Sequence, residues 1–144
     1  MIVPAPRADR ARYVLDTSAI LTLFEGEDGV ATVRDVLRRA RRGRAAVIVS
    51  LMTTYELLHV TSQERGEEEG LRRVLEMRSL PLEEAALSPA VAIRAAHLKA
   101  NHRISVADSW IAATAVETRS TLVHKDPELL ALEGVVALHA LPLK

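Results

Sequence analysis

With 144 residues, of which 49% are hydrophobic, the chain is long enough for one domain with a substantial core. The 19 Lys and Arg residues balance the 19 Asp and Glu residues, so net charge favours neither a nucleic-acid nor a membrane partner. The absence of cysteine excludes disulfide bonds, zinc–thiolate sites and thiol catalysis. No apolar run approaches the roughly 18 residues of a membrane span, and the start of the chain does not resemble a signal peptide. We expect a cytoplasmic protein with an extension at 1–11 and one domain at 12–144.

Segments typical of strands and helices alternate along the chain. A short apolar run at 12–16 indicates a buried strand, and SAILTLFEG at 18–26 has helical spacing and stops at a glycine. The run AAVIVS at 45–50 is typical of a strand buried on both faces. Further strands are predicted at 79–85 (an edge strand), 121–126 and 134–141. Further helices are predicted at 29–42, 51–65, 67–78, 89–100, 105–119 and 126–132.

This alternation predicts an α/β fold. Strands that are joined through helices form right-handed crossovers, and the resulting sheet is mostly parallel with helices on both faces. We therefore expect a three-layer α/β/α sandwich with four or five strands. In such sheets, ligands bind in a crevice outside the carboxyl ends of the strands.

Four acidic residues are predicted to start from that edge of the sheet. Asp16 ends the first strand, and Glu56 lies in the helix that follows the second strand. Asp108 lies in the first turn of the helix before the 121–126 strand, and Asp126 ends that strand. Their side chains are therefore expected to converge on one crevice.

Each acid also has a purely structural interpretation, which has to be weighed against a site. Asp16, Asp108 and Asp126 all stand where a helix begins, and acids are favoured as helix caps. Glu56 lies inside a helix on an apolar stripe, so it is no cap, and burying it without an Arg or a cation as partner would be costly. Capping therefore explains three of the acids, whereas a metal site explains all four.

The chemistry of the four acids favours a hard cation. Two carboxylates about 4 Å apart repel each other by roughly 4 kcal/mol at an effective dielectric constant of about 20, so a cluster requires raised pKa values or a counter-charge. Oxygen ligands favour Mg²⁺ or Mn²⁺ over Zn²⁺. Such ions suit phosphodiester hydrolysis, because one can lower the pKa of the attacking water while another neutralises the leaving oxygen.

Four blocks of sequence appear in the order and spacing of a known family. YVLDTSAIL, SLMTTYELLHV, AAHLKANHRISVADSWIAATA and TLVHKDPEL lie between residues 13 and 130. Together they resemble the PIN-domain ribonucleases, specifically the VapC toxins of bacterial toxin–antitoxin pairs. The resemblance implies that Asp16, Glu56, Asp108 and Asp126 are the metal-binding acids and that Ser18 supports their site.

The same resemblance implies an activity and partners. It implies a Mg²⁺- or Mn²⁺-dependent endoribonuclease that acts on structured RNA such as tRNA or rRNA. It also implies a homodimer that is inhibited by a cognate antitoxin. One position departs from the family, which usually carries Thr or Ser two residues before the last Asp, where this chain has His124.

Other interpretations remain open at this level. The six Arg residues between 33 and 44, among them Arg38, Arg39 and Arg42, are candidates for RNA contacts or form a solvated helix face. A haloacid-dehalogenase phosphatase would use Asp16 as nucleophile, but it needs a second acid where this chain has Ser18. A catalytically inactive RNA- or protein-binding module of the same fold is the main alternative, and the complete set of four acids argues against it.

Overall fold

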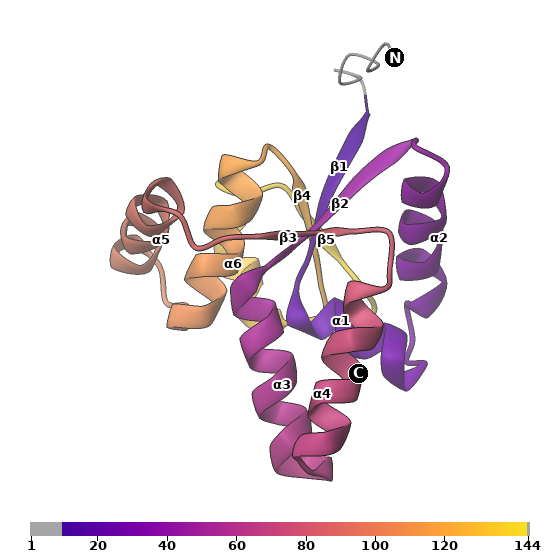
Figure 1. Ribbon diagram of the computed structural model, residues 1–144. Coiled ribbons are helices and arrows are strands. Elements are labelled where there is room, and N and C mark those ends of the chain that lie inside the picture. Colours follow the sequence, from indigo (N-terminus) through magenta and orange to yellow (C-terminus); the bar gives the residue numbers. More distant parts are fainter. Residues whose placement is uncertain (1–9, 144) are drawn as a thin grey trace.

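The computed structural model describes residues 10–143, whose strands form one parallel sheet between two layers of helices (Figure 1). The strands are β1 (Ala11–Leu15), β2 (Ala45–Ser50), β3 (Glu83–Ala85), β4 (Thr121–His124) and β5 (Leu138–Ala140). The helices are α1 (Thr17–Glu25), α2 (Val30–Arg41), α3 (Leu51–Arg65), α4 (Glu67–Arg78), α5 (Pro89–Asn101), α6 (Val106–Glu117) and the 3₁₀ helix η1 (Pro127–Leu132). The expected α/β/α sandwich is confirmed, with five strands.

The order of the strands places a crevice beside β1. The order is β3-β2-β1-β4-β5, so the chain first builds the sheet on one side of β1 and then on the other. Val14 of β1 pairs with Ile48 of β2 and with Leu122 of β4. In open parallel sheets, the point where the strand order reverses leaves a crevice at the carboxyl ends of the strands. Here that point lies between β1 and β4, which are followed by Asp16 and Asp126.

The strands bury alternate residues on the two faces of the sheet. Val14 and Ile48 belong to a core that includes buried residues of α5, α6 and η1. Leu15 and Val49 belong to a second core that includes residues of α1, α2, α3 and α4. Because successive side chains of a strand point to opposite faces, both layers of helices are held by one short run of apolar residues.

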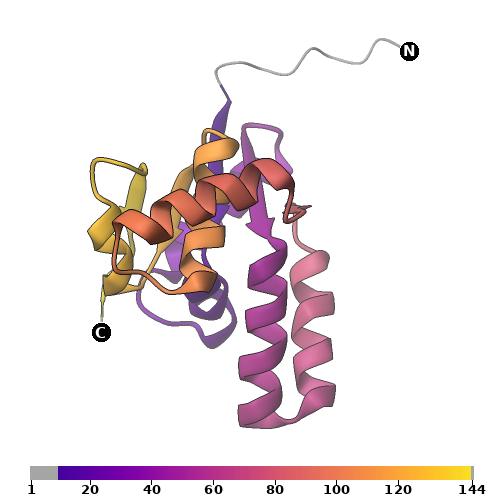
Figure 2. The same ribbon diagram turned by 90° about the vertical axis from the view of Figure 1, so that its left-hand side faces the viewer.

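Helices α3 and α4 form a hairpin that extends beyond the sheet (Figure 2). The two helices approach each other closely at Gly70, where an added Cβ would lie 3.1 Å from the carbonyl oxygen of Leu58. The hairpin matters for the site because its first helix carries Glu56.

Three expected elements differ from the prediction. The strand expected at 79–85 contains only Glu83–Ala85, because the chain still turns at Leu80, whose carbonyl oxygen accepts from the backbone N–H of Leu82. The helix expected at 126–132 is a 3₁₀ helix, as is common for short pieces. The strand expected at 134–141 contains only Leu138–Ala140, since the N–H groups of Val135 and Val136 both donate to Leu132 and prolong the preceding turn.

The expected extension at 1–11 lies mostly outside the described residues, and β1 begins at Ala11. Among the helices between residues 10 and 143, none combines the length and the apolar character that a membrane span requires.

Candidate metal centre

Asp16 is buried at the carboxyl end of β1, where it caps α1 with only one of its carboxylate oxygens. Its Oδ2 accepts hydrogen bonds from the backbone N–H of Ser18, at 3.1 Å, and from the Ser18 hydroxyl. Its Oδ1 is shielded from solvent and has no hydrogen-bond partner among the described residues. A buried carboxylate oxygen without a partner is costly. The capping interpretation of Asp16 is therefore correct for one oxygen and leaves the other unexplained.

Glu56 is half-buried in α3 and is held by a hydroxyl group of α1. The Thr17 hydroxyl donates to Oε1 of Glu56 at 2.7 Å. The sequence predicted an Arg or a cation as the partner of Glu56; among the described residues its hydrogen-bond partner is Thr17, and the cation stays a prediction. Thr17 was missed as a site residue because a Thr beside Asp16 looks like part of a helix cap.

Asp108 and Asp126 lie at the starts of α6 and η1, and a third acid lies beside them. Asp108 is buried, and Asp126 caps η1 by accepting the N–H of Glu128 at 2.9 Å. Carboxylate oxygens of Asp108, Asp126 and Glu128 lie within 4.8 Å of one another, close enough to hold one metal ion. Glu128 was not predicted as a site residue. Its only signal in the sequence was the spacing of two residues from Asp126, which equally fits a helix start.

The carboxylates of the cluster affect one another electrostatically. Burial, followed by the charges of Asp16 and Asp126, raises the pKa of Asp108 to about 7. Burial is also the largest cause of the raised pKa of Asp16, to which the charge of Asp126 contributes. Burial, Asp16 and Asp126 likewise raise the pKa of Glu56. Asp16 and Glu56 are therefore near enough to Asp126 to feel its charge, but the carboxylate oxygens that lie within 4.8 Å of one another are those of Asp108, Asp126 and Glu128. That the four acids singled out in the sequence form one metal site stays a prediction.

Ser18 and His124 connect the ends of β1 and β4. The Ser18 hydroxyl, which donates to Asp16, accepts the backbone N–H of Lys125 at 2.8 Å. His124 is fully buried, and its Nδ1 accepts the backbone N–H of Asp126 at 3.2 Å. A ring nitrogen that accepts carries no proton, so the neutral ring carries its proton on Nε2. Burial lowers the pKa of His124, which favours this neutral form.

A family comparison agrees with this geometry. The family model described as the PIN domain matches residues 13–135. This range includes the acids described above, called the acidic cluster from here on: Asp16, Glu56, Asp108, Asp126 and Glu128. The chain belongs to the PIN-domain family. Membership of this family excludes the alternative of a haloacid-dehalogenase phosphatase, in which Asp16 would be a nucleophile.

Solved structures with the same fold include several toxin–antitoxin complexes. The PIN domain is similar to a chain of VapBC2 from Rickettsia felis, bound to a DNA fragment from its promoter, with a TM-score of 0.75, 18% identity and coverage of 91% of this chain and 99% of that chain. DNA-bound VapBC from Salmonella typhimurium has a TM-score of 0.70 at 19% identity, with coverage of 90% and 98%. The sarcin–ricin loop-cleaving toxin VapC20 from Mycobacterium tuberculosis has a TM-score of 0.66 at 14% identity, with coverage of 84% and 95%. Comparison with curated proteins gave no significant match.

The donor set of this PIN domain fits a hard divalent cation. Asp108, Asp126 and Glu128 offer carboxylate oxygens that lie within 4.8 Å of one another, and such oxygens are the ligands preferred by Mg²⁺ and Mn²⁺. The unpartnered Oδ1 of Asp16 is a buried acceptor that a cation would satisfy. Burial, and to a smaller extent neighbouring negative charges, raise the pKa values of Asp16, Glu56 and Asp108, and a bound cation would counter both effects by stabilising the charged carboxylates.

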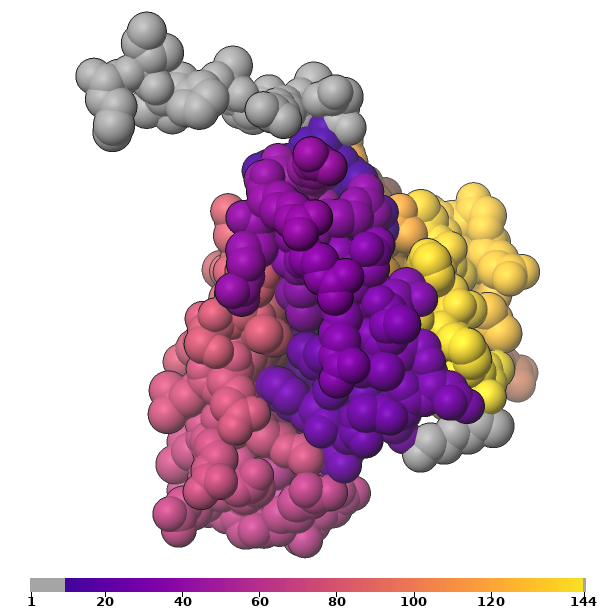
Figure 3. Space-filling model, turned by 90° about the vertical axis from the view of Figure 1, so that its right-hand side faces the viewer, coloured from indigo at the N-terminus to yellow at the C-terminus, as the bar shows by residue number. Residues whose placement is uncertain are grey.

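The arginines of α2 lie elsewhere in the PIN domain. Arg39 donates to the Tyr13 hydroxyl at 3.1 Å and lies over its ring. Arg38 lines a pocket of about 370 Å³ between α2 and Pro81. Figure 3 shows the face of the molecule that α2 covers. Since α2 leads into the start of β2, Arg42 at its end lies at the opposite edge of the sheet from the acids. Contacts of these arginines with RNA stay a prediction.

Proposed function

We propose that this PIN domain is a metal-dependent endoribonuclease, the toxin of a VapC-type toxin–antitoxin pair. The observation that carries the proposal is the buried, unpartnered Oδ1 of Asp16, beside carboxylates whose pKa values are raised by burial and, to a smaller extent, by neighbouring negative charges. If the acids served only as helix caps and ion-pair partners, this oxygen would be expected to have a hydrogen-bond donor, and it has none among the described residues. A divalent cation satisfies it and offsets the repulsion as well.

In this proposal the acids hold Mg²⁺ or Mn²⁺, and other residues keep the acids in place. Asp16, Asp108 and Asp126 bind the ion, and Glu56 and Glu128 complete the coordination or orient water. A bound ion supplies a water of lowered pKa and neutralises charge on the departing oxygen. Thr17 holds Glu56, and Ser18 fixes Asp16 against the end of β4. These contacts reduce the reorganisation that binding and hydrolysis require.

The solved structures support the toxin assignment. Two are VapBC complexes, and one toxin is described by its cleavage of the sarcin–ricin loop. By analogy we expect an RNA substrate with defined structure, such as tRNA or rRNA, a cognate antitoxin, a homodimer and a cytoplasmic location. These expectations rest on similarity of fold.

The first test is thermal melting of wild type and Asp16→Asn, freed of any antitoxin, in EDTA and with Mn²⁺. An ion that binds only the folded state stabilises it by about 2.7 kcal/mol at 100 times its Kd, which raises Tm by several degrees for a chain of this size. We expect this rise in wild type and in the control Asp35→Asn, which alters an exposed acid of α2. With Mn²⁺ we expect no rise of Tm in Asp16→Asn. In EDTA we expect this variant to have a higher Tm than wild type, because repulsion among the acids is relieved. RNA cleavage should fall at least about a hundredfold in Asp16→Asn.

Two results would contradict the proposal. If Asp16→Asn cleaves RNA as fast as wild type, the acids take no part in the reaction. Millimolar Mn²⁺ that leaves the Tm of wild type unchanged, with no cleavage of RNA, would favour the alternative of a catalytically inactive RNA- or protein-binding module.

A further inference from the structure

Arginines gather at the amino ends of the strands, the edge of the sheet opposite the acidic cluster and at the top of Figure 1. Arg10 precedes β1 and Arg44 precedes β2, and the first residues of these two strands are paired in the sheet. Arg119 lies two residues before β4, which pairs with the other side of β1. The chain reaches β2 from α2 through Arg42. These residues are called the amino-edge arginines from here on: Arg10, Arg42, Arg44 and Arg119.

The amino-edge arginines have no role in holding the fold together. Between residues 10 and 143, none of their side chains has a hydrogen-bond or ion-pair partner, and all but that of Arg10 are fully exposed. Two neighbouring arginines differ in this respect. Nε of Arg12 donates to the Thr118 carbonyl at 2.7 Å at the end of α6, and Arg39 donates to the Tyr13 hydroxyl. The fold therefore explains Arg12 and Arg39 but not the other four.

Two acids near these arginines do not neutralise them. Glu117 of α6 is paired with Arg94 of α5 at 3.1 Å. Glu83 lines a pocket of about 320 Å³ together with Arg10, without forming an ion pair with it. Like charges that start from adjacent strands, about 4.8 Å apart, repel each other. A bound anion would relieve this repulsion.

Arg119 also has a backbone conformation that arginine disfavours. Its N–H donates to Val116 at 3.1 Å and that of Ser120 donates to Ala115 at 2.8 Å, which is the Schellman motif at the end of a helix. Its φ is 54°, whereas the other described residues with positive φ are all glycines, including Gly43 at the matching position after α2. A side chain with a Cβ costs free energy in this conformation, so the stability of the fold does not explain an arginine here. Strain of this kind points to a function of the side chain.

The composition of this surface indicates the class of partner. Among residues 10–143, none of the large hydrophobic side chains that are exposed lies in the segments 10–12, 41–44 or 117–120. Interfaces with proteins have an apolar centre, whereas interfaces with nucleic acids are polar and positively charged. Guanidinium groups are suited to phosphate because their N–H groups donate in pairs. The surface therefore fits the phosphate backbone of a nucleic acid.

We propose that the amino-edge arginines form a second RNA-binding surface, which contacts phosphates of a structured RNA remote from the bond that is cleaved. The inference rests on the proposed function, from which the RNA substrate is taken. It adds Arg10, Arg44 and Arg119 to Arg42, which the sequence alone indicated. The 5 residues of β1 span about 17 Å between this surface and the acidic cluster, a distance that a short stem of RNA covers.

The test measures how binding of RNA depends on salt. The probe is a fluorescently labelled RNA hairpin in EDTA, so that no metal supports cleavage. The variants are Arg119→Gly, Arg119→Lys, the double variant Arg42→Gln/Arg44→Gln and the control Arg72→Gln, which removes an exposed charge from α4. We expect Arg119→Gly to weaken binding about fivefold to tenfold at about 0.1 M salt and to reduce the slope of log K against log salt by about 1. The double variant should lose about twice as much slope, and Arg119→Lys and Arg72→Gln should stay close to wild type.

Thermal melting in EDTA separates this role from a structural one. We expect Arg119→Gly to raise Tm by about 3 °C, because glycine adopts a positive φ without the penalty of a Cβ. The variant thus gains stability while it loses affinity for RNA. A lower Tm together with unchanged RNA binding would show a structural role of Arg119 and overturn the inference. Salt slopes of Arg119→Gly and the double variant equal to that of Arg72→Gln would overturn it too. So would competition by polyglutamate that depends on these arginines when binding of the hairpin does not, since that result indicates an acidic protein.

Failure of this inference is distinguishable from failure of the proposed function. Melting with Mn²⁺ reports the metal site alone, and the salt slope reports the amino-edge arginines alone. If Mn²⁺ stabilises wild type and the arginine variants equally while their RNA binding is also equal, the second surface is wrong and the metal site stands. If Mn²⁺ stabilises none of these proteins, the proposed function fails, whatever the slope.

Discussion

At the scale of the residue, Asp16 shows that a helix cap can leave one carboxylate oxygen without a partner. Its Oδ2 caps α1 through Ser18, while its Oδ1 remains a buried acceptor without a partner. The same holds for Asp126, whose Oδ1 caps η1 while the carboxylate lies near Asp108 and Glu128. A cap is therefore a way to hold one oxygen of a carboxylate still while the other remains available.

His124 stands where the family usually has Thr or Ser, and its contact explains how it serves in that place. Its Nδ1 accepts the N–H of Asp126, as the oxygen of a Thr or Ser could also do. The ring thus holds the backbone of Asp126 through Nδ1, while its Nε2 is buried without a hydrogen-bond partner among the described residues.

This contact predicts different effects of two substitutions of His124. In His124→Asn the amide oxygen takes the place of Nδ1, so the affinity for Mn²⁺ should stay close to that of wild type. In His124→Leu the acceptor is lost, and the affinity should fall about 10- to 100-fold, as is usual when a group that orients a ligand is removed. Isothermal titration calorimetry with Mn²⁺ measures the affinity of both variants. Equal losses in the two variants would show that volume matters at this position and the hydrogen bond does not.

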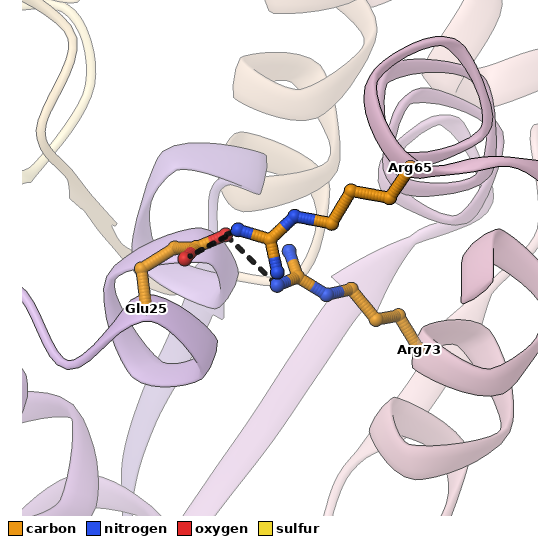
Figure 4. Close-up of polar contacts among 3 residues, drawn as sticks. All are labelled: Glu25, Arg65 and Arg73. Carbon is orange, nitrogen blue, oxygen red and sulfur yellow. Dashed lines mark hydrogen bonds and ion pairs between the residues drawn. The ribbon is translucent and has the colours of Figure 1, made fainter.

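At the scale of the element, an ion cluster joins α1 to the α3–α4 hairpin (Figure 4). Glu25, the last residue of α1, accepts hydrogen bonds from Arg65 of α3 and Arg73 of α4, at 3.1 and 2.8 Å. Arg73 is buried and also lies over the ring of Phe24. Since α1 starts at Asp16 and α3 carries Glu56, the ion cluster connects the two helices whose side chains build the site.

We expect Glu25→Gln to destabilise the fold by about 2 kcal/mol, because it leaves the buried guanidinium of Arg73 without a counter-charge. Arg65→Gln is the matched control, and it should cost less than about 1 kcal/mol since Arg65 is half-exposed. Urea unfolding at pH 7 measures the stability of both variants.

The stability that Glu25 contributes also depends on pH. The contact with Arg73 is the main cause of the lowered pKa of Glu25, so this stabilisation is present above pH 4.5 and is lost on acidification below it. Equal losses of stability in Glu25→Gln and Arg65→Gln would show that the burial of Arg73 does not set the cost.

At the scale of the whole molecule, the acidic cluster makes the metal-free protein less stable as the pH rises. The pKa values of Asp16, Glu56 and Asp108 are raised, so the folded state keeps protons that the unfolded chain has already released. Stability therefore falls with rising pH, from the ordinary pKa of these acids up to about 7. His124 has a lowered pKa and opposes this trend below pH 6.5.

This linkage predicts opposite behaviour with and without metal. In EDTA, Tm should decrease between pH 5 and about 7.5. At a fixed concentration of Mn²⁺ the stabilisation by the ion should grow over the same range, because the ion binds the deprotonated acids. In Asp108→Asn the decrease in EDTA should be shallower. A Tm in EDTA that rises steadily over this range would show that the pKa values of these acids are not raised in the folded state.

The sequence by itself determined the fold class and the place of the four acids. Apolar runs such as AAVIVS, alternating with helical segments, predicted a parallel sheet, and the carboxyl ends of parallel strands meet at one edge. Asp16 and Asp126 follow two such strands, and Asp108 and Glu56 lie on helices beside that edge. Periodicity and strand direction are local properties of the chain, so they can be read without a structure.

Only the tertiary structure decided the contacts that hold the acids in place. The Thr17–Glu56 hydrogen bond depends on how α1 packs against α3, and the contact of Ser18 with Lys125 joins residues 107 positions apart. The inclusion of Glu128 depends on the 3₁₀ turn of η1. Such contacts are fixed by the packing of distant segments, and no periodicity in the sequence records them.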